Sequence, residues 1–280
     1  MPAPCPWLRW LYSRRKNTEK LLENRIRVGA VSYLNTKPLL YGIEHSEVSK
    51  WMELSLDFPS EVARKLKEGE IDLGLVPVAI IPELPDYFID ADYCIGANGP
   101  VASVGIFSDV PLEKVETVLL DYQSRTSVAL AQVLLKHYWG LTPKFEAATP
   151  GYINRIGGAT AGVVIGDRAF RQKKVSKFEY DLADAWKKWT GLPFVFAAWV
   201  SNKELPEDFI QAFNLANEWG LWHINEVVDK NPFALYDLKD YYTHKISYRL
   251  DEEKRLGLKK FLELITGKSF KVQPEILTGG

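Results

Sequence analysis

The sequence contains little cysteine and no long apolar run. Only two of its 280 residues are cysteine, Cys5 and Cys94, and they stand in unrelated contexts. A structural disulfide is therefore not expected, and a reducing, cytoplasmic location suits this composition. No stretch approaches the roughly 18 consecutive apolar residues that a membrane-spanning helix requires, so we expect no membrane-embedded part.

Histidine is also scarce, and the two signs of charge nearly cancel. The four histidines are scattered without the spacing of a ligand set, so we expect neither a metal site nor a cofactor. With 35 basic and 36 acidic side chains, the formal net charge of -1 makes no case for binding nucleic acid or an anionic membrane. The remaining composition, 46% hydrophobic and 25% charged, is that of an ordinary soluble globular protein.

The first 25 residues lack the order of a secretory signal. Arg9 interrupts a very short apolar patch, and a basic cluster at residues 14–16 follows that patch instead of preceding an apolar core. We expect residues 1–25 to be a disordered tail or the result of an upstream start codon. The alternative is a basic anchor for a membrane or a partner.

From Ile26 onward, apolar runs typical of buried strands alternate with amphipathic helical patterns. Strands are expected at residues 28–31, 71–78, 101–107, 115–121, 161–167 and 194–200. Helices are expected to begin near residues 38, 60, 124, 168 and 251, and a long helix near either residue 202 or residue 206. This alternation predicts an α/β fold, in a chain long enough for one large domain or two lobes.

The order of these elements indicates two lobes. We expect residues 26–108 and 201–280 to form the first lobe and residues 109–200 the second. The strands Val101–Phe107 and Phe194–Val200 would then cross between the lobes, and two crossings make a hinge with a ligand cleft. Periodicity alone would equally permit one continuous doubly wound sheet.

Small polar side chains follow the first strand. Ser32, Asn35 and Thr36 come immediately before Pro38, where an apolar helical pattern begins. A strand end of this kind, ahead of a helix that proline starts, is how α/β proteins present hydroxyls and amides to a cleft. The ordinary alternative is that these residues only form a loop and cap the helix.

A hydroxyl-rich helix start follows the strand that ends at Asp121. The helix opens with Ser124, Arg125, Thr126 and Ser127. The free amide groups and partial positive charge of a helix N-terminus favour an anion, and an arginine can pair with a carboxylate. The alternative is plain N-capping with a solvated arginine.

Two further polar residues lie beside apolar strands. Asp167 stands at the end of the strand expected at residues 161–167, and the alternative is an N-cap next to a surface Arg168. Ser103 lies inside an apolar run, where a hydroxyl usually bonds to backbone. Each of these signals is weak alone, but three polar strand ends at one cleft would make a binding site.

Five stretches in this order resemble the chorismate dehydratase family. They are "VGAVSYLNTKPL", "EGEIDLGLVPV", "SRTSVALAQVLL", "VIGDRAF" and "DLADAWKKWTGLPFVFAAW". The similarity runs from Ile26 to about Gly267, and the first and last stretches at this spacing are more specific than any single motif. The resemblance implies a two-lobe, periplasmic-binding-protein-like fold of type II. It also implies that chorismate loses water to give 3-[(1-carboxyvinyl)oxy]benzoate, the first step of the futalosine route to menaquinone.

The implied reaction sets tasks for the candidate residues. The site must hold two carboxylates, stabilise charge on one of them and assist a leaving hydroxyl. The resemblance suggests Asn35 and Ser103 as catalytic residues that hydrogen-bond the reacting edge of the substrate. Asp167 is the only carboxylate that could act as a base, and the alternative base is the enolpyruvyl carboxylate of the substrate itself. The implied substrate-binding residues are Ser32, Thr36, Ser124, Arg125, Thr126, Ser127 and Asp167.

Two other functions share the implied fold. One is a solute-binding protein for a small carboxylate, which performs no chemistry but needs export, and the sequence has no recognisable export signal. The other is the related enzyme that forms 1,4-dihydroxy-6-naphthoate, which carries a different polar opening near its N-terminus. The sequence leaves the oligomeric state open.

Overall fold

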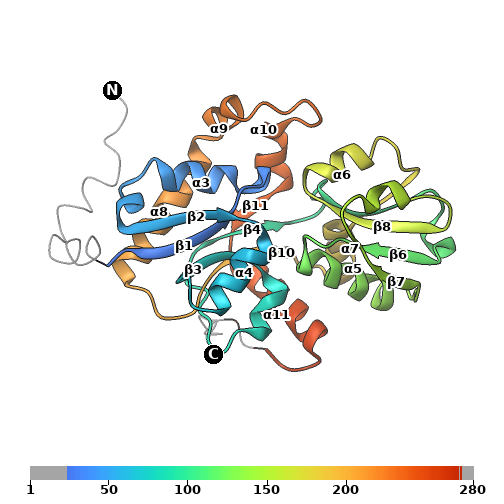
Figure 1. Ribbon diagram of the computed structural model, residues 1–280, viewed down its shortest axis with the longest axis horizontal. Helices are drawn as coiled ribbons and strands as arrows, with labels where there is room; N and C mark the ends of the chain where they lie inside the picture. The colour runs from blue at the N-terminus through green and yellow to red at the C-terminus, as the bar shows by residue number, and fades with distance from the viewer. Residues whose placement is uncertain (1–23, 271, 273–280) are drawn as a thin grey trace.

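The computed structural model describes residues 24–270 and residue 272. Their strands form two separate sheets, one with the order β11-β4-β10-β3-β1-β2 and one with the order β7-β6-β8-β5-β9. Figure 1 shows the two sheets side by side, each with its own helices. The predicted two-lobe α/β architecture is therefore confirmed, and the single continuous sheet is excluded. The predicted tail lies outside the described residues except for Asn24 and Arg25.

The first lobe is built on the six-stranded sheet. Its strands are β1 (Ile26–Val31), β2 (Met52–Asp57), β3 (Leu73–Pro77), β4 (Tyr93–Ala97), β10 (Phe194–Ser201) and β11 (Ser247–Arg249). β1 lies parallel to β2 and β3, whereas β10 is antiparallel to β3 and β4. Every residue of β3 and β4 is buried, which explains why such strands are continuously apolar instead of alternating.

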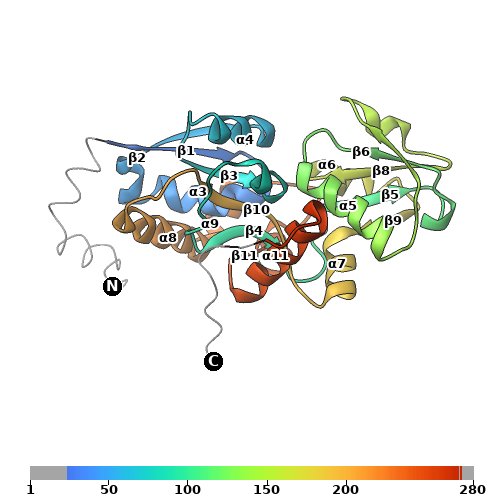
Figure 2. The ribbon, with the colours of Figure 1, turned by 90° about the horizontal axis from the view of Figure 1, so that it is seen from below.

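Helices cover both faces of this sheet. Figure 2 shows α4 on one face and α3 with α8 on the other. α3 and α8 pack backbone to backbone, since a Cβ on Gly42 would lie 1.9 Å from the Ala216 carbonyl oxygen and one on Gly220 would lie 2.0 Å from that of Pro38. This contact anchors the start of α3. The helices and turns are α3 (Lys37–Glu44), α4 (Pro59–Lys67), α8 (Glu207–Trp222), α9 (Ile224–Lys230), α10 (Leu238–Asp240), α11 (Glu252–Thr266), η1 (Leu34–Thr36), η2 (Glu47–Trp51), η3 (Val78–Glu83) and the π-helix η6 (Tyr241–Lys245).

The second lobe is built on the five-stranded sheet. Successive residues of its central strand point to opposite faces: Val163 and Ile165 join the main core, whereas Val164 joins a smaller cluster with Phe107 and Tyr152. The strands are β5 (Val104–Ser108), β6 (Thr117–Leu120), β7 (Lys144–Ala147), β8 (Thr160–Ile165) and β9 (Phe178–Asp181). The helices and turns are η4 (Leu112–Lys114), α5 (Arg125–His137), η5 (Tyr152–Arg155), α6 (Asp167–Gln172) and α7 (Leu182–Thr190).

The chain passes between the sheets twice, but not within the two strands expected to cross. Residues 98–103 connect β4 to β5, and residues 191–193 connect α7 to β10. β5 belongs wholly to the five-stranded sheet and β10 to the six-stranded sheet, so the expected boundaries at 108 and 200 each misplace one strand. Both strands are almost completely buried, and burial alone does not indicate which sheet a strand joins. We therefore propose that the first lobe includes β10 and the second lobe includes β5.

The described residues can also be compared with what the sequence predicted about a membrane span, a metal site and the cysteines. No helix within 24–270 combines the length and apolar composition needed to cross a membrane. In the same part of the chain, no three histidine, cysteine, aspartate or glutamate side chains gather as they would around a metal ion. Cys94 is a free thiol buried in β4, and burial raises its pKa to about 12. Cys5 lies outside the described residues.

Candidate active site

A cavity with about 640 Å³ of atom-free space, mouth included, lies where the two lobes meet. This inter-lobe cavity is lined from the first lobe by residues of β1, β3, β4 and β10, and from the second by the end of β8 and the loop before α5. Most of its lining is apolar. A few polar groups on an apolar wall are typical of a small-molecule site. The polar side chains are those of Tyr33, Asn35, Thr36, Ser103, Gln123, Ser124 and Ser127.

Five of the nine residues expected from the sequence line this cavity. They are Asn35, Thr36, Ser103, Ser124 and Ser127. The other four, Ser32, Arg125, Thr126 and Asp167, are not among its lining residues. The structure thus brings together polar side chains from three separate stretches of the chain. Two of them are polar strand ends singled out in the sequence, and the third is the run that holds Ser103, whereas the strand end at Asp167 contributes only Gly166.

Asn35 occupies the first-lobe side of the cavity, in the short turn η1 between β1 and α3. The hydroxyl of Thr36 donates to Asn35 Oδ1 at 3.2 Å, and the hydroxyl of Tyr248 donates to the Asn35 backbone carbonyl at 2.9 Å. Within the described residues nothing accepts a hydrogen bond from Asn35 Nδ2. The side-chain carbonyl of Asn35 is therefore held by the Thr36 hydroxyl, and its Nδ2 amide group is available to donate to a ligand. Ser32 is exposed to solvent one turn earlier.

Ser103 ends the connection between β4 and β5 and is buried. The hydroxyl of Tyr241 donates to Ser103 Oγ at 2.8 Å, which leaves the proton of Ser103 free to point at a ligand. The two preceding residues are held by Asp181, whose Oδ2 accepts from the amides of Val101 at 2.9 Å and Ala102 at 2.8 Å. Ala102 has a φ of 63°, which is rare without glycine, so these bonds hold a strained loop.

The second-lobe side of the cavity is the start of α5. Ser124 is the N-cap: its Oγ accepts from the Ser127 amide at 3.1 Å and donates to Ser127 Oγ at 2.8 Å. The hydroxyl proton of Ser127 is therefore available. The amides of Arg125 and Thr126 are first-turn donors, which an α-helix leaves without an internal partner. Capping and ligand binding are thus compatible at Ser124, although the sequence presented them as alternatives.

Thr126 and Arg125 point away from the inter-lobe cavity and join the lobes instead. Thr126 Oγ1 accepts from the amide of Ala79, in η3 of the first lobe, at 3.2 Å. Arg125 pairs with Glu83, also in η3, with nitrogen–oxygen distances of 3.0 and 3.2 Å. Successive residues of an α-helix are rotated by about 100° about its axis, so the side chains of neighbours in the sequence face different surroundings.

Asp167 begins α6 and is exposed, although Gly166 just before it lines the cavity. Partial desolvation still raises the pKa of Asp167 above its ordinary value. Arg168 is not a free surface group: its Nη2 lies 2.6 Å from Oδ2 of the buried Asp121. Asp121 Oδ1 also accepts from the Gln123 amide at 2.8 Å, so this ion pair supports the loop that leads into α5.

Sequence reasoning missed two polar residues of the cavity, Tyr33 and Gln123. The Tyr33 hydroxyl donates to Gln123 Oε1 at 3.3 Å and so bridges the lobes. Burial raises the pKa of Tyr33 to about 12, which keeps the phenol protonated. Tyr33 directly follows Ser32 and Gln123 directly precedes Ser124 in the sequence. This proximity to expected site residues was the only indication in the sequence that they could line the cavity.

The cavity offers uncharged hydrogen-bond groups and no ionised side chain among its described lining residues. Neutral donors preorganised in an apolar cavity stabilise negative charge, because there is little water to compete with them. The same arrangement offers no general base within the cavity wall. The site is therefore equipped to bind an anion and to stabilise charge that develops on it.

Solved structures with this fold identify the architecture. A protein from Archaeoglobus fulgidus superposes with a TM-score of 0.69 at 14% identity, covering 87% of this chain and 97% of that one. A Candida albicans protein described as having the generic periplasmic binding protein structural fold gives 0.56 at 12% identity, covering 89% and 92%. At such identities the likeness concerns the fold alone, which is the two-lobe periplasmic-binding-protein-like fold of type II.

Sequence relatives identify the family. A family model described as menaquinone biosynthesis matches residues 26–266. A chorismate dehydratase from Thermus thermophilus is 31% identical over 230 residues, which is 74% of this chain and 84% of that protein. One from Campylobacter jejuni is 25% identical over 244 residues, which is 84% of this chain and 95% of that protein. By these matches, the chain belongs to the menaquinone biosynthesis family and, within it, to the chorismate dehydratases.

Proposed function

We propose that this protein is a hydro-lyase that converts chorismate to 3-[(1-carboxyvinyl)oxy]benzoate and water, the first step of the futalosine route to menaquinone. The observation that carries the proposal is the inter-lobe cavity, where uncharged donors from both lobes converge on an apolar wall in a chain related to chorismate dehydratases. Chorismate is a small dicarboxylate with an apolar ring, and both features suit this lining.

Binding is proposed to use the two sides of the cavity for different parts of the substrate. The first turn of α5 takes one carboxylate through the Ser127 hydroxyl and the first-turn amides, while Ser124 donates its own proton to Ser127 Oγ and so leaves the Ser127 proton available. Thr36 and Asn35 contact the substrate from the first lobe. Because these groups are neutral, they bind a dianion without an ion pair that would have to be broken for release.

The chemistry is an elimination across two neighbouring ring carbons. The proton leaves the carbon that bears the ether oxygen, and its electrons enter an extended dienolate that ends on the ring carboxylate. Expulsion of the neighbouring C4 hydroxyl as hydroxide then makes the ring aromatic, and hydroxide with the proton gives water. Ser103 Oγ–H and Asn35 Nδ2–H are proposed to hydrogen-bond the reacting edge and stabilise the leaving oxygen.

The proton acceptor is proposed to be the enolpyruvyl carboxylate of the substrate. Asp167, the only protein carboxylate considered from the sequence, is exposed at the start of α6 and is not among the lining residues. An intramolecular acceptor needs only to be held in the right geometry, and a well-oriented group of this kind is highly effective. The catalytic contribution of the protein is then positioning and charge stabilisation.

The test is to mix purified protein with chorismate alone, with and without a metal chelator. We expect the absorbance of the cyclohexadiene to disappear and the benzoate product to form in both samples. Chorismate that binds unchanged would support a solute-binding role, and no interaction with chorismate would favour the related naphthoate-forming activity. Product that forms only after a cofactor is added would contradict the proposal. A cytoplasmic location, with chorismate as the small-molecule partner and neither nucleic acid nor membrane bound, stays a prediction.

A further inference from the structure

One segment near the end of the chain contacts both proposed catalytic residues. It runs from Tyr241 to Arg249 and consists of the π-helix η6 followed by β11 at the edge of the six-stranded sheet. Figure 1 shows this segment on the side of the first lobe that faces the second. Its three tyrosines, Tyr241, Tyr242 and Tyr248, are all buried. π-Helices are rare and occur mainly at functional sites.

Tyr241 comes from a first-lobe segment and contacts the second lobe and the connection between the lobes. Its ring is 1% exposed and packs edge-on against Phe170 of α6, with centroids 5.4 Å apart and planes at 83°. Its hydroxyl donates to Ser103 Oγ at 2.8 Å. This bond occupies one lone pair of the serine oxygen and polarises the serine hydroxyl, which makes Ser103 a better donor toward the cavity.

Tyr248 acts on the other side of the cavity. It lies in β11, whose pairing with β4 aligns Ser247 with Gly96 and Arg249 with Tyr93. Its hydroxyl donates to the backbone carbonyl of Asn35 at 2.9 Å. η1 is a three-residue turn without a side-chain cap, so this bond and the Thr36 hydroxyl on Asn35 Oδ1 fix the direction of the asparagine side chain.

We infer that Tyr241 and Tyr248 are positioning residues that set Ser103 and Asn35 at the correct separation to act on one substrate oxygen. Ser103 lies in the connection between the lobes, whereas Asn35 lies in a turn of the first lobe. The hydroxyls of Tyr241 and Tyr248, seven residues apart on one buried segment, hold Ser103 and Asn35 in fixed positions relative to each other. The inference rests on the proposed function, because it concerns the geometry of that reaction.

The chain supplies a matched control in the same segment. Tyr242 is 2% exposed, and within the described residues its hydroxyl has no hydrogen-bond partner. Tyr242→Phe therefore removes the same atom from a neighbouring buried ring without breaking a bond. We compare Tyr241→Phe, Tyr248→Phe and Tyr242→Phe with the unchanged protein by kcat, KM and melting temperature. The two positioning variants are also made in the Ser103→Ala and Asn35→Ala backgrounds.

Tyr241→Phe should lower kcat by about 100-fold with KM changed less than about threefold, since a misplacement near 1 Å costs about that much. Tyr248→Phe should lower kcat by about 10-fold, because it acts through a backbone carbonyl that the turn also restrains. Tyr242→Phe should leave kcat unchanged. In the Ser103→Ala background Tyr241→Phe should cost nothing further, and Tyr248→Phe should likewise cost nothing after Asn35→Ala.

Additive losses in the double variants would overturn the inference, because each phenol would then act independently of its partner. A loss of kcat that only follows the melting temperature, or a variant that does not fold, would assign that phenol to stability and also overturn it. Full activity in Tyr241→Phe and Tyr248→Phe would reject the inference while leaving the proposed function intact. An unchanged protein that does not consume chorismate would reject the proposed function, and this inference with it.

Discussion

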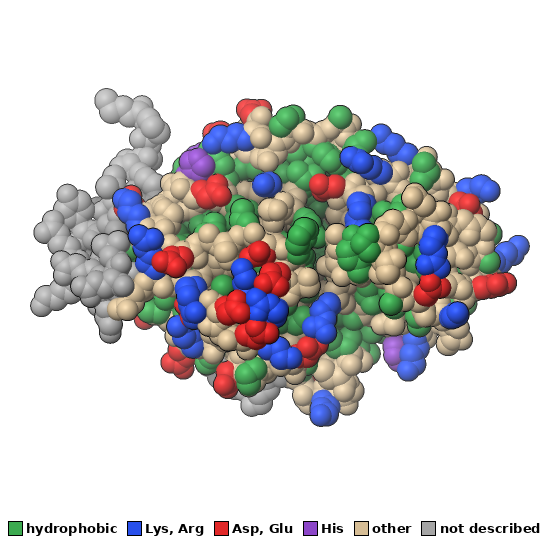
Figure 3. Space-filling view, in the orientation of Figure 1, with side chains coloured by type: hydrophobic (Ala, Val, Ile, Leu, Met, Phe, Trp, Pro, Cys, Tyr) green, Lys and Arg blue, Asp and Glu red, His purple; other side chains and the backbone are tan. Residues whose placement is uncertain are grey.

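Two hollows flank the start of α5, and they differ in chemistry. The inter-lobe cavity carries hydroxyls and amides, whereas a wide surface depression between α4, η3 and α5 is rich in charge. Figure 3 shows mixed positive and negative side chains gathered over α4. We call this second region the charged hollow. Its lining residues are Ser60, Ala63, Arg64, Lys67, Glu68, Ile80, Glu83, Leu84 and Arg125.

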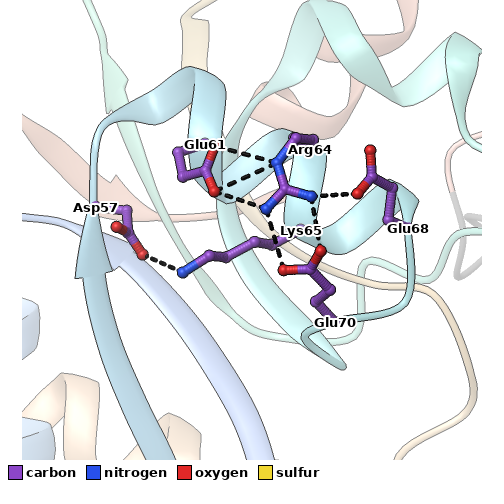
Figure 4. Close-up of polar contacts among 6 residues, drawn as sticks. All are labelled: Asp57, Glu61, Arg64, Lys65, Glu68 and Glu70. Carbon is purple, nitrogen blue, oxygen red and sulfur yellow. Dashed lines mark hydrogen bonds and ion pairs between the residues drawn. The ribbon is translucent and has the colours of Figure 1, made fainter.

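The cations of the charged hollow already have anionic partners. Figure 4 shows Arg64 surrounded by Glu61, Glu68 and Glu70, all of which it contacts through its guanidinium group. Glu83 lies 3.0 Å from Arg125 across the lobe boundary. A cation in such a pair attracts an anionic ligand weakly, because binding the ligand breaks the existing pair. The neutral donors of the inter-lobe cavity have no such competitor, which supports the proposal that substrate binds there and not in the charged hollow.

The largest effect in the inter-lobe cavity is expected at Asn35. Asn35→Ala removes an uncharged donor from the cavity and should lower turnover by about a hundred- to a thousandfold, with the melting temperature and substrate binding preserved. Asn35→Asp should be at least as poor, because a third carboxylate would face the two of the substrate. Steady-state kinetics and thermal unfolding, measured on the same samples, distinguish a catalytic role of Asn35 from a structural one. Full activity, or a loss matched by a collapse in stability, would make Asn35 a structural residue.

Ser127 and Thr126, which are neighbours in α5, are expected to affect different properties: Ser127 the affinity for chorismate and Thr126 the free energy of unfolding. Ser127→Ala should weaken chorismate binding by about 10- to 100-fold, since a hydrogen bond to a charged group contributes about 1.5–3 kcal/mol. Thr126→Ala should leave affinity unchanged and lower the free energy of unfolding by about 1 kcal/mol, because it loses the bond to the Ala79 amide. Titration calorimetry and denaturant unfolding measure the two effects. The reverse result would mean that the helix start presents Thr126 to the ligand.

The smallest effect is expected at Arg125. Arg125→Gln removes an exposed ion pair with Glu83, and such pairs contribute about 0.2–1 kcal/mol. KM for chorismate should change less than about threefold. Lys67→Gln is the matched control, since its Nζ lies 3.8 Å from the same glutamate. A rise in KM of tenfold or more for Arg125→Gln alone would show that the arginine leaves Glu83 to bind substrate.

Local patterns in the sequence determined the kinds of element and several of their ends. The six expected strands correspond to β1, β3, β5, β6, β8 and β10, and Ser124 is the N-cap that its position indicated. The strands β2, β4, β7, β9 and β11 were not expected from the sequence. The features that were expected depend on hydrogen bonds and apolar periodicity within a few residues, so the local sequence is enough to predict them. The polar strand ends were found for the same reason, and five of the nine candidates line one cavity.

Contacts between distant residues were decided only by the tertiary structure. Which sheet β5 and β10 join, and whether Arg125 faces the cavity or Glu83, depend on packing that no local pattern records. The bonds from Tyr241 to Ser103 and from Tyr248 to Asn35 span 138 and 213 residues. The hydroxyl of a buried tyrosine usually has a hydrogen-bond partner, and the fold determines which partner lies within reach.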